Sequence, residues 1–406
     1  MRRRREFLWW AAGALVALLL LLFAMNRQSD VIQRSTATQV AARPAEGITL
    51  FRSKGCATCH SGGQQTGAGA PELRQLPSAS TLPRLVAALW NHAPRMLESM
   101  HARHVPYPDL SYEEAGQLVA YLYLQGYNDG PGDADRGRQL FAAKHCIGCH
   151  NAGGPGAGSG PSLAAMTVPS TALIWTQVLW NHASNMQASM QRQGIAWPKF
   201  RENELRDLFA YVQQSGRAAA GDPMSEGDPD RGWKVFQEKG CGACHGLTRE
   251  QGQIGAQFGP DHNLPPTYAQ FGAAMLNHFP EMQRAMDMQR TPPPSFHAQE
   301  MQDLAVFLYS LHYLEPSGSP QVGASVFTWR GCAQCHGSEA EGGRLGPPLR
   351  GRGQTYTAVR LAADLWRHGA SMYEKSQTTG QPWPTLQESD IGNLLSFLNT
   401  PLEGRR

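Results

Sequence analysis

The eight cysteines of this 406-residue chain fall into four copies of one pentapeptide, Cys-x-x-Cys-His. The copies occupy residues 56–60, 146–150, 241–245 and 332–336, and no cysteine is left over. Their first cysteines are 90, 95 and 91 residues apart. A fixed period of this length indicates a tandem array of similar structural units rather than one large domain.

This pentapeptide is the attachment sequence for c-type haem: the two thiols bind the haem vinyl groups, and the histidine supplies one axial nitrogen to iron. One copy would also fit a redox dithiol or half of a zinc site, but four copies without further cysteines disfavour both. We therefore predict four covalently bound haem c groups. The attachment residues are Cys56, Cys59, Cys146, Cys149, Cys241, Cys244, Cys332 and Cys335, and the proximal ligands are His60, His150, His245 and His336.

Other landmarks recur in each unit in the same order. A Gly-x-x-x-Phe segment precedes each motif, beginning at Gly47, Gly137, Gly232 and Gly323. An apolar segment with the pattern Leu-Trp-Asn-His, or a variant of it, follows the motif. Each unit closes with an amphipathic segment whose apolar residues recur at i, i+3 and i+4, the pattern of a packed helix. The aromatic residues of these closing segments are Tyr121, Tyr211, Phe307 and Phe397.

Each unit resembles a class I c-type cytochrome, the small all-helical fold of mitochondrial cytochrome c and its bacterial relatives. The similarity covers the opening Gly and Phe, the haem motif, a Gly-Pro-x-Leu stretch, a later methionine and the closing helix. It implies an all-α protein with four tandem cytochrome c-like domains at 46–130, 131–220, 226–315 and 317–406. It also implies that the first and last helices of a unit cross where their Gly and aromatic residues meet, as Gly47 with Tyr121 and Gly323 with Phe397.

The resemblance further implies that a proline carbonyl accepts a hydrogen bond from the proximal histidine, which fixes the orientation of the imidazole. Pro71, Pro161 and Pro347 each lie eleven residues after that histidine, whereas Pro260 lies fifteen residues after it. The third unit also has Leu276 where the other units have a tryptophan. We therefore expect the third site to differ most from the others. The tryptophans either shield haem from water or fill the core, and they are Trp90, Trp180 and Trp366.

Two candidates for the sixth iron ligand lie one helical turn apart in every unit, so spacing alone does not separate them. The resemblance to a Gly-x-x-x-Met segment favours methionine, and His/Met ligation raises the haem potential relative to bis-histidine ligation. The favoured ligands are Met96, Met186, Met282 and Met372. The alternative is bis-histidine ligation through His92, His182, His278 and His368. A second methionine at 100, 190 and 286 is replaced by Ser376 in the fourth unit, so it is not the common ligand.

An uncharged stretch at residues 7–25 follows four arginines at residues 2–5. Its length approaches the roughly 20 residues that span a bilayer, and the arginines favour a cytoplasmic amino terminus. A cleaved signal peptide would have an apolar region of about 7–15 residues and a small-x-small site after it, which Met25-Asn26-Arg27-Gln28 does not offer. We predict a single-pass inner-membrane anchor at 1–25, a tether at 26–45 and haem domains on the periplasmic side.

Charge is balanced beyond the first thirty residues, with 31 basic and 31 acidic residues, which disfavours nucleic acid as a partner. No segment outside the haem motifs supplies a recognisable catalytic base or nucleophile, so the chemistry belongs to the haems. We predict a membrane-anchored electron carrier, without catalytic residues of its own, between a respiratory or photosynthetic membrane component and a periplasmic redox protein. Alternatives are a cytochrome subunit of a periplasmic oxidoreductase complex, a multihaem peroxidase with one catalytic haem, and a sensor of diatomic gases. The last two require an open or displaceable sixth position.

Overall fold

The computed structural model describes residues 44–60, 70, 73, 81–152, 158–168, 171–218, 227–247, 254–259, 262–311 and 317–402. The anchor predicted at 1–25 and nearly all of the tether predicted at 26–45 lie outside these residues. Among the helices that are described, none combines the length and apolar character needed to span a bilayer. Residues from Ala42 onward form one compact unit.

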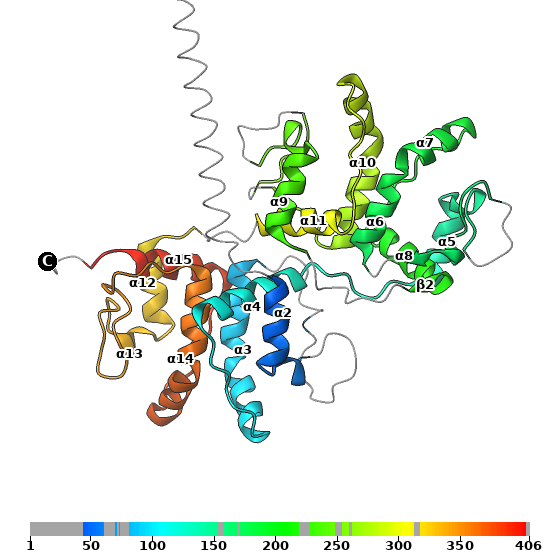
Figure 1. Cartoon of the computed structure of the whole chain (residues 1–406). Coiled ribbons are helices and arrows are strands. Elements are labelled where there is room, and N and C mark those ends of the chain that lie inside the picture. Colours follow the sequence, from blue (N-terminus) through cyan, green and yellow to red (C-terminus); the bar gives the residue numbers. More distant parts are fainter. Residues whose placement is uncertain are drawn as a thin grey trace, which may run out of the picture. The chain divides into compact units, whose positions relative to one another are not determined.

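Helices dominate the described residues, which confirms the all-helical fold predicted from the sequence (Figure 1). The exception is a pair of two-residue parallel strands in the second sequence repeat, β1 (Thr167–Val168) and β2 (Arg217–Ala218). We number the four predicted domains 1 to 4 in chain order. Each contains a first helix, a short helical turn at the haem motif, a ligand-bearing helical segment and a last helix. That segment is one long helix in domains 1, 3 and 4 and two consecutive helices in domain 2.

The bounds of these elements follow the repeat. Domain 1 consists of α2 (Pro44–Ser53), η1 (Cys56–Thr58), α3 (Leu82–Ala102) and α4 (Tyr112–Gln125). Domain 2 consists of α5 (Ala134–Ala143), η3 (Cys146–Gly148), η4 (Leu163–Ala165), α6 (Ala172–Asn181), α7 (Ala183–Arg192) and α8 (Glu204–Ser215). Domain 3 consists of α9 (Pro229–Glu238), η5 (Cys241–Ala243), α10 (Tyr268–Met288) and α11 (Glu300–Ser310). Domain 4 consists of α12 (Pro320–Trp329), α13 (Ala333–His336), α14 (Ala358–Thr379) and α15 (Glu388–Asn399).

The first and last helices of each domain cross at the predicted glycine. A Cβ atom built on Gly47 would lie 2.6 Å from Tyr121 Cβ, and one on Gly323 would lie 2.6 Å from Phe397 Cβ. The aromatic residue one turn after the glycine packs on the same partner, with ring centroids 5.5 Å apart for Phe51 and Tyr121. The absence of a side chain on the glycine therefore allows the two helix backbones to approach closely.

A threonine begins the long helix of every domain. Its hydroxyl accepts a hydrogen bond from the backbone amide three residues later, so it caps the amino terminus of the helix. These residues are Thr81, Thr171, Thr267 and Thr357. The cap fixes where the ligand-bearing helix starts, and hence which residues of that helix reach the haem motif.

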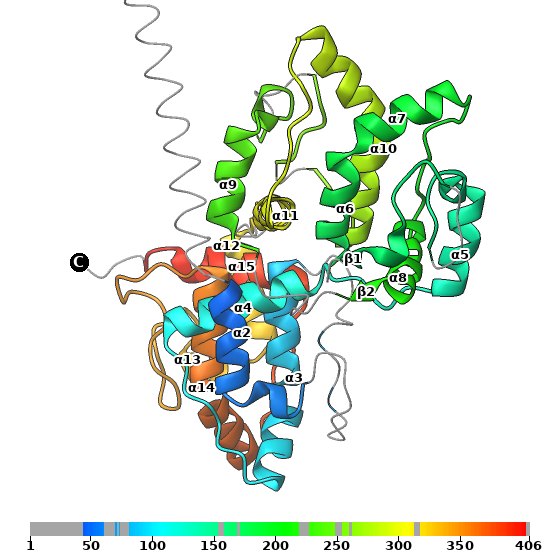
Figure 2. The ribbon, with the colours of Figure 1, turned by 45° about the vertical axis from the view of Figure 1, so that its right-hand side comes forward.

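The four domains pack in two pairs, domain 1 with domain 4 and domain 2 with domain 3. Helix α14 of domain 4 contacts α3 and α4 of domain 1, while α10 of domain 3 contacts α6 and α8 of domain 2. Figure 1 shows α3 beside α14, and both ribbon views show α6 beside α10 (Figures 1 and 2). The ligand-bearing helices thus form the centre of each pair.

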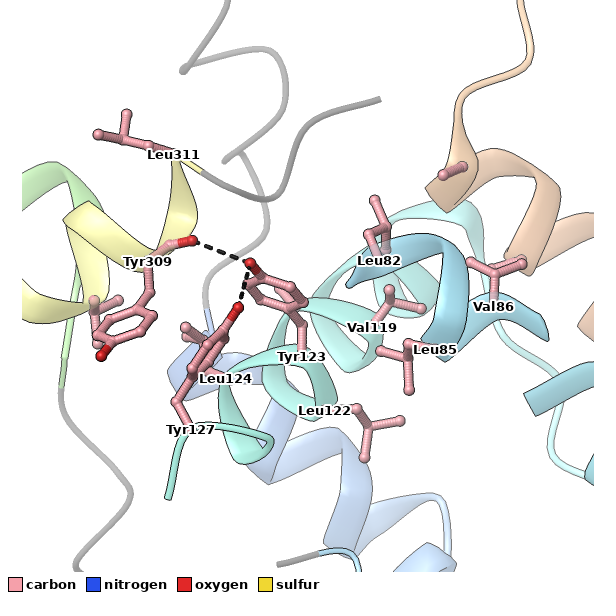
Figure 3. Packing of buried hydrophobic residues seen from close by; sticks show 14 of the residues in the cluster. Leu82, Leu85, Val86, Val119, Leu122, Tyr123, Leu124, Tyr127, Tyr309 and Leu311 are labelled. Carbon is pink, nitrogen blue, oxygen red and sulfur yellow. Dashed lines mark hydrogen bonds between the residues drawn. The ribbon is translucent and has the colours of Figure 1, made fainter. Parts of the chain in front are cut away.

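A buried tyrosine cluster connects domain 1 to domain 3. The Tyr123 hydroxyl donates to the Tyr309 carbonyl at 3.2 Å, and the Tyr127 hydroxyl donates to the Tyr123 hydroxyl at 2.9 Å (Figure 3). The Tyr268 amide donates to the Tyr127 carbonyl at 2.9 Å. These hydrogen bonds satisfy the hydroxyls of Tyr123 and Tyr127 inside an apolar cluster that draws residues from all four domains.

Candidate haem sites

The four haem motifs adopt one local conformation. In each, the amide of the histidine donates to the carbonyl of the first cysteine, at 2.9 Å in domains 1 to 3 and 3.0 Å in domain 4. None of the eight cysteines is paired in a disulfide and all are half-buried, so every sulfur is available for a bond to haem. The motif turn therefore presents two sulfur atoms and one imidazole together.

The proximal imidazoles are held by a backbone carbonyl eleven residues further along the chain. Nδ1 lies 3.0 Å from the Pro161 carbonyl for His150 and 2.9 Å from the Pro347 carbonyl for His336, as the resemblance implied. With Nδ1–H donating to a carbonyl, Nε2 is the nitrogen that binds a metal. Pro71, the corresponding residue of domain 1, lies outside the described residues.

Domain 3 uses a different residue for the same contact. Nδ1 of His245 lies 2.9 Å from the carbonyl of Ala256, again eleven residues on, whereas Pro260 lies outside the described residues. A Cβ on Gly255 would lie 2.7 Å from the His245 ring, as one on Gly160 would from the His150 ring. The four additional residues of this loop therefore follow the carbonyl that anchors the histidine.

The histidine candidates for the sixth ligand approach the proximal ring in two domains. The ring centroids of His60 and His92 are 5.9 Å apart, and those of His245 and His278 are 6.5 Å apart. In domain 2, Nδ1 of His182 bonds to the Val178 carbonyl at 2.5 Å. Among the described residues, neither His182 in domain 2 nor His368 in domain 4 makes such a ring contact with its proximal histidine.

The methionine candidates lie four residues after the histidine candidates, in the same helix except in domain 2, where Met186 lies in α7. Met282 and Met372 are partly buried and pack against the large apolar cluster, while Met96 and Met186 are also half-buried. Among the histidine candidates, His92 and His182 are half-buried, whereas His278 and His368 are exposed. The methionine ligands remain a prediction.

Burial lowers the pKa of three imidazoles at these sites. Burial lowers the pKa of His92, and the neighbouring His60 and Arg95 lower that pKa further. Burial likewise lowers the pKa of His182 and of His245, although a backbone carbonyl raises each in part. A neutral imidazole at neutral pH has a nitrogen lone pair available for iron. The donor set therefore fits covalently attached haem.

Comparison with known families agrees with this geometry. The family model described as cytochrome c matches residues 134–216, 229–312 and 321–401. The chain belongs to the cytochrome c family. A second family model, described as subunit III of the cbb3-type cytochrome c oxidase, matches residues 42–122. Searches among curated proteins and among solved structures returned no match. Together the two family models match part of each of the four predicted cytochrome c domains.

The tryptophan and asparagine of the recurring Leu-Trp-Asn-His pattern bind the paired cytochrome domain. Trp90 Nε1 donates to the Pro384 carbonyl at 2.6 Å, and Trp383 stacks on Trp90 with ring centroids 4.0 Å apart. Asn91 donates to the Leu386 carbonyl and accepts from the Leu386 amide, both at 2.8 Å. We call these contacts, together with their equivalents in the second domain pair, the docking clamp.

The clamp is reciprocal within the first pair. Trp366 Nε1 donates to the Pro108 carbonyl at 3.0 Å, and the Tyr107 hydroxyl donates to the Trp366 carbonyl at 2.9 Å. Tyr107 also stacks on Trp366 at 4.8 Å between ring centroids. Each domain therefore offers one helix and one proline-containing loop to the other, in a pseudo-twofold arrangement.

Domains 2 and 3 repeat the arrangement. Trp180 Nε1 donates to the Pro294 carbonyl at 2.8 Å, and the Asn181 amide group exchanges two hydrogen bonds with the backbone of Phe296. In the reverse direction Asn277 exchanges two hydrogen bonds with the Phe200 backbone, at 2.7 Å each. Composition and motif matching predict no role for these asparagines. Their recurrence beside the histidine was the available indication of a shared role.

Proposed function

We propose that this chain is a membrane-anchored tetrahaem cytochrome that carries electrons between a membrane respiratory or photosynthetic component and a periplasmic redox protein. Membership of the cytochrome c family and repeated haem motifs establish a c-type cytochrome with several haem-attachment domains. The proposal adds the count of four haems, the anchor at residues 1–25, the periplasmic location and the two protein partners.

One observation carries the proposal: the helices that bear the candidate iron ligands are the ones that dock the domains together. Asn91 of the clamp is adjacent in sequence to His92, and Asn277 is adjacent to His278. The clamp therefore joins paired domains at the residues next to a candidate ligand. A carrier with several redox centres needs such direct contact between them, because the protein supplies the spacing while the haems supply the chemistry.

The contacts also suggest the order in which electrons pass. Domain 4 docks on domain 1, domain 1 bonds to domain 3 through the tyrosine cluster, and domain 3 docks on domain 2. We propose a path in the order 4–1–3–2, or its reverse, rather than 1–2–3–4. Either end of that path, domain 2 or domain 4, is a candidate entry point for a partner.

The first test is a haem count with a redox titration on the full-length protein. We expect four haems per chain, complete reversible reduction, and no binding of carbon monoxide to the reduced protein. Fewer haems would contradict the count. A high-spin haem that binds carbon monoxide would instead favour the peroxidase or gas-sensing alternatives.

The second test concerns the membrane. The full-length chain should remain in the membrane fraction after a high-salt wash, whereas a variant with Leu19→Arg and Leu20→Arg in the predicted anchor should be released from it. Protease added to intact spheroplasts should digest the haem domains of the full-length chain. Resistance of those domains to external protease would contradict the periplasmic location.

A further inference from the structure

The position of the sixth ligand in domain 3 is constrained from the proximal side. The His245 ring is held at Nδ1 by the Ala256 carbonyl, and its face stacks on Phe258 with ring centroids 4.6 Å apart. The ring therefore has a defined orientation, with Nε2 as its metal-binding nitrogen. A second residue that held the same iron would therefore face this Nε2 atom.

The His–His separation matches that arrangement. Imidazole nitrogens bind metal ions at about 2 Å, so two imidazoles on opposite sides of one ion have ring centroids roughly 6 Å apart. The observed separations are 5.9 Å for His60 and His92 and 6.5 Å for His245 and His278. The ring planes are 68° and 69° apart, and two rings on a common metal axis are free to rotate about it.

The same geometry arises in two domains that differ in sequence around it. Domain 3 has a longer loop after the haem motif, and it has Leu276 where domain 1 has Trp90. Despite these differences the ring separations agree within 1 Å. A packing accident would not be expected to repeat across a changed loop and a changed neighbour, whereas a shared metal-binding role would.

The docking clamp fixes the backbone beside each histidine. Asn91 precedes His92 and is bonded twice to Leu386, and Asn277 precedes His278 and is bonded twice to Phe200. Met96 and Met282 lie one turn beyond these anchored residues. The backbone next to His92 and His278 is therefore held in place, as the backbone of a metal ligand needs to be.

We propose that His92 and His278 are the sixth haem ligands of domains 1 and 3, in place of Met96 and Met282. This inference rests on the proposed haem attachment at both motifs. Because methionine ligation raises the haem potential relative to bis-histidine ligation, these two haems would titrate below any His/Met haems in the same chain.

The experiment compares His92→Ala and Met96→Leu in the full-length holoprotein, with His101→Ala as the matched control on the same helix. We expect His92→Ala to convert one of the four haems to a high-spin form that binds carbon monoxide, and added imidazole to restore the low-spin spectrum. Met96→Leu and His101→Ala should retain four low-spin haems. A high-spin haem in Met96→Leu, or no spectral change in His92→Ala, would overturn the proposal.

A second measurement covers the case in which His92→Ala does not fold. The Met96→Leu, Met282→Leu double variant should keep the full intensity of any methionine-to-ferric charge-transfer band present in the wild type, and its potentials should not shift. Loss of part of that band would overturn the proposal. Haem content, measured in every variant, separates the two levels: too few haems contradict the proposed function, whereas full haem content with the wrong ligand contradicts only this inference.

Discussion

The residue before each haem motif has a left-handed backbone conformation. Gly55, Gly240 and Gly331 have φ values of 82°, 72° and 85°, and the corresponding residue of domain 2 is His145, with φ 62°. Glycine adopts this conformation without steric cost, whereas a side chain brings Cβ close to the following carbonyl oxygen. Because His145 is exposed, no burial of its side chain compensates for that cost.

His145→Gly should therefore stabilise domain 2. The left-handed conformation costs an ordinary residue roughly 1–2 kcal/mol, and the greater freedom of glycine in the unfolded chain offsets part of the gain. We expect the free energy of unfolding to rise by about 0.5–1 kcal/mol, measured by denaturant unfolding followed by circular dichroism. The reverse change Gly240→His in domain 3 is the control and should lower it. A lower stability of His145→Gly would show that the imidazole makes a contact that matters more than the strain.

The anchor of His245 shows what a residue pattern can and cannot predict. The cysteines, the proximal histidines and the carbonyls of Pro161 and Pro347 followed from motif and resemblance, because each is tied to a residue type. In domain 3 the acceptor is the carbonyl of Ala256, and every residue has a carbonyl. In all three cases the accepting carbonyl belongs to the residue eleven positions after the histidine. That residue is a proline only where the loop has its usual length.

At the scale of helices, the first and last helices cross closely because the glycine at the crossing has only a hydrogen atom where other residues have a side chain. A Cβ on Gly232 would lie 2.0 Å from the Asp303 carbonyl oxygen and 2.5 Å from Phe307 Cβ. The Asp303 carboxylate, in turn, accepts a hydrogen bond from the Asp228 amide at 2.8 Å and pairs with Arg231 at 2.9 Å. Separating α9 from α11 would therefore disturb packing and a charged contact together.

Gly232→Ala should destabilise domain 3 by about 3 kcal/mol, since overpacking of a close contact commonly costs 1–3 kcal/mol and here the neighbour is a backbone atom that cannot rotate away. Gly130→Ala is the matched control, because a Cβ there meets no atom within 4 Å. Thermal unfolding of the two variants, followed by circular dichroism, tests this. Equal melting temperatures for the two variants would show that α9 and α11 can move apart without a loss of stability.

Helix order and the Gly–aromatic crossings were predictable because they arise within one repeat and have a fixed sequence spacing. The threonine caps are equally local, but the apolar pattern does not predict them because the four threonines lie outside it. They are Thr81, Thr171, Thr267 and Thr357. The break between α6 and α7 at His182 was not predicted either, since no proline or glycine marks it. A local structural feature can be predicted from a sequence only when it requires a distinctive residue type, such as the glycine of the helix crossing.

At the scale of the molecule, the pairing of domain 1 with 4 and of 2 with 3 could not be predicted from the sequence. Each repeat contains the tryptophan or the asparagine of the clamp, or both, so the sequence is compatible with several pairings. The choice depends on contacts far apart in the chain, such as the ion pair of Arg84 with Glu388 at 3.0 Å and the hydrogen bond from Tyr373 to Glu98 at 2.6 Å. These polar contacts lie outside the shared clamp and are specific to the first pair.

Pairing through the clamp predicts that each asparagine stabilises only the domain pair in which it forms its hydrogen bonds. Asn91→Ala removes two hydrogen bonds and leaves the Leu386 amide and carbonyl unpaired, which costs about 1–3 kcal/mol for each unsatisfied group that stays buried. We expect faster amide hydrogen exchange in α3 and α14 with α6 and α10 unchanged, and Asn181→Ala should give the opposite result.

Because the clamp joins domains 1 and 4 beside a candidate ligand, Asn91→Ala should also slow electron equilibration between those two domains. Faster exchange in all four helices of either variant would mean that the two pairs form a single cooperative unit, and the contact order 4–1–3–2 would then no longer distinguish one path from another.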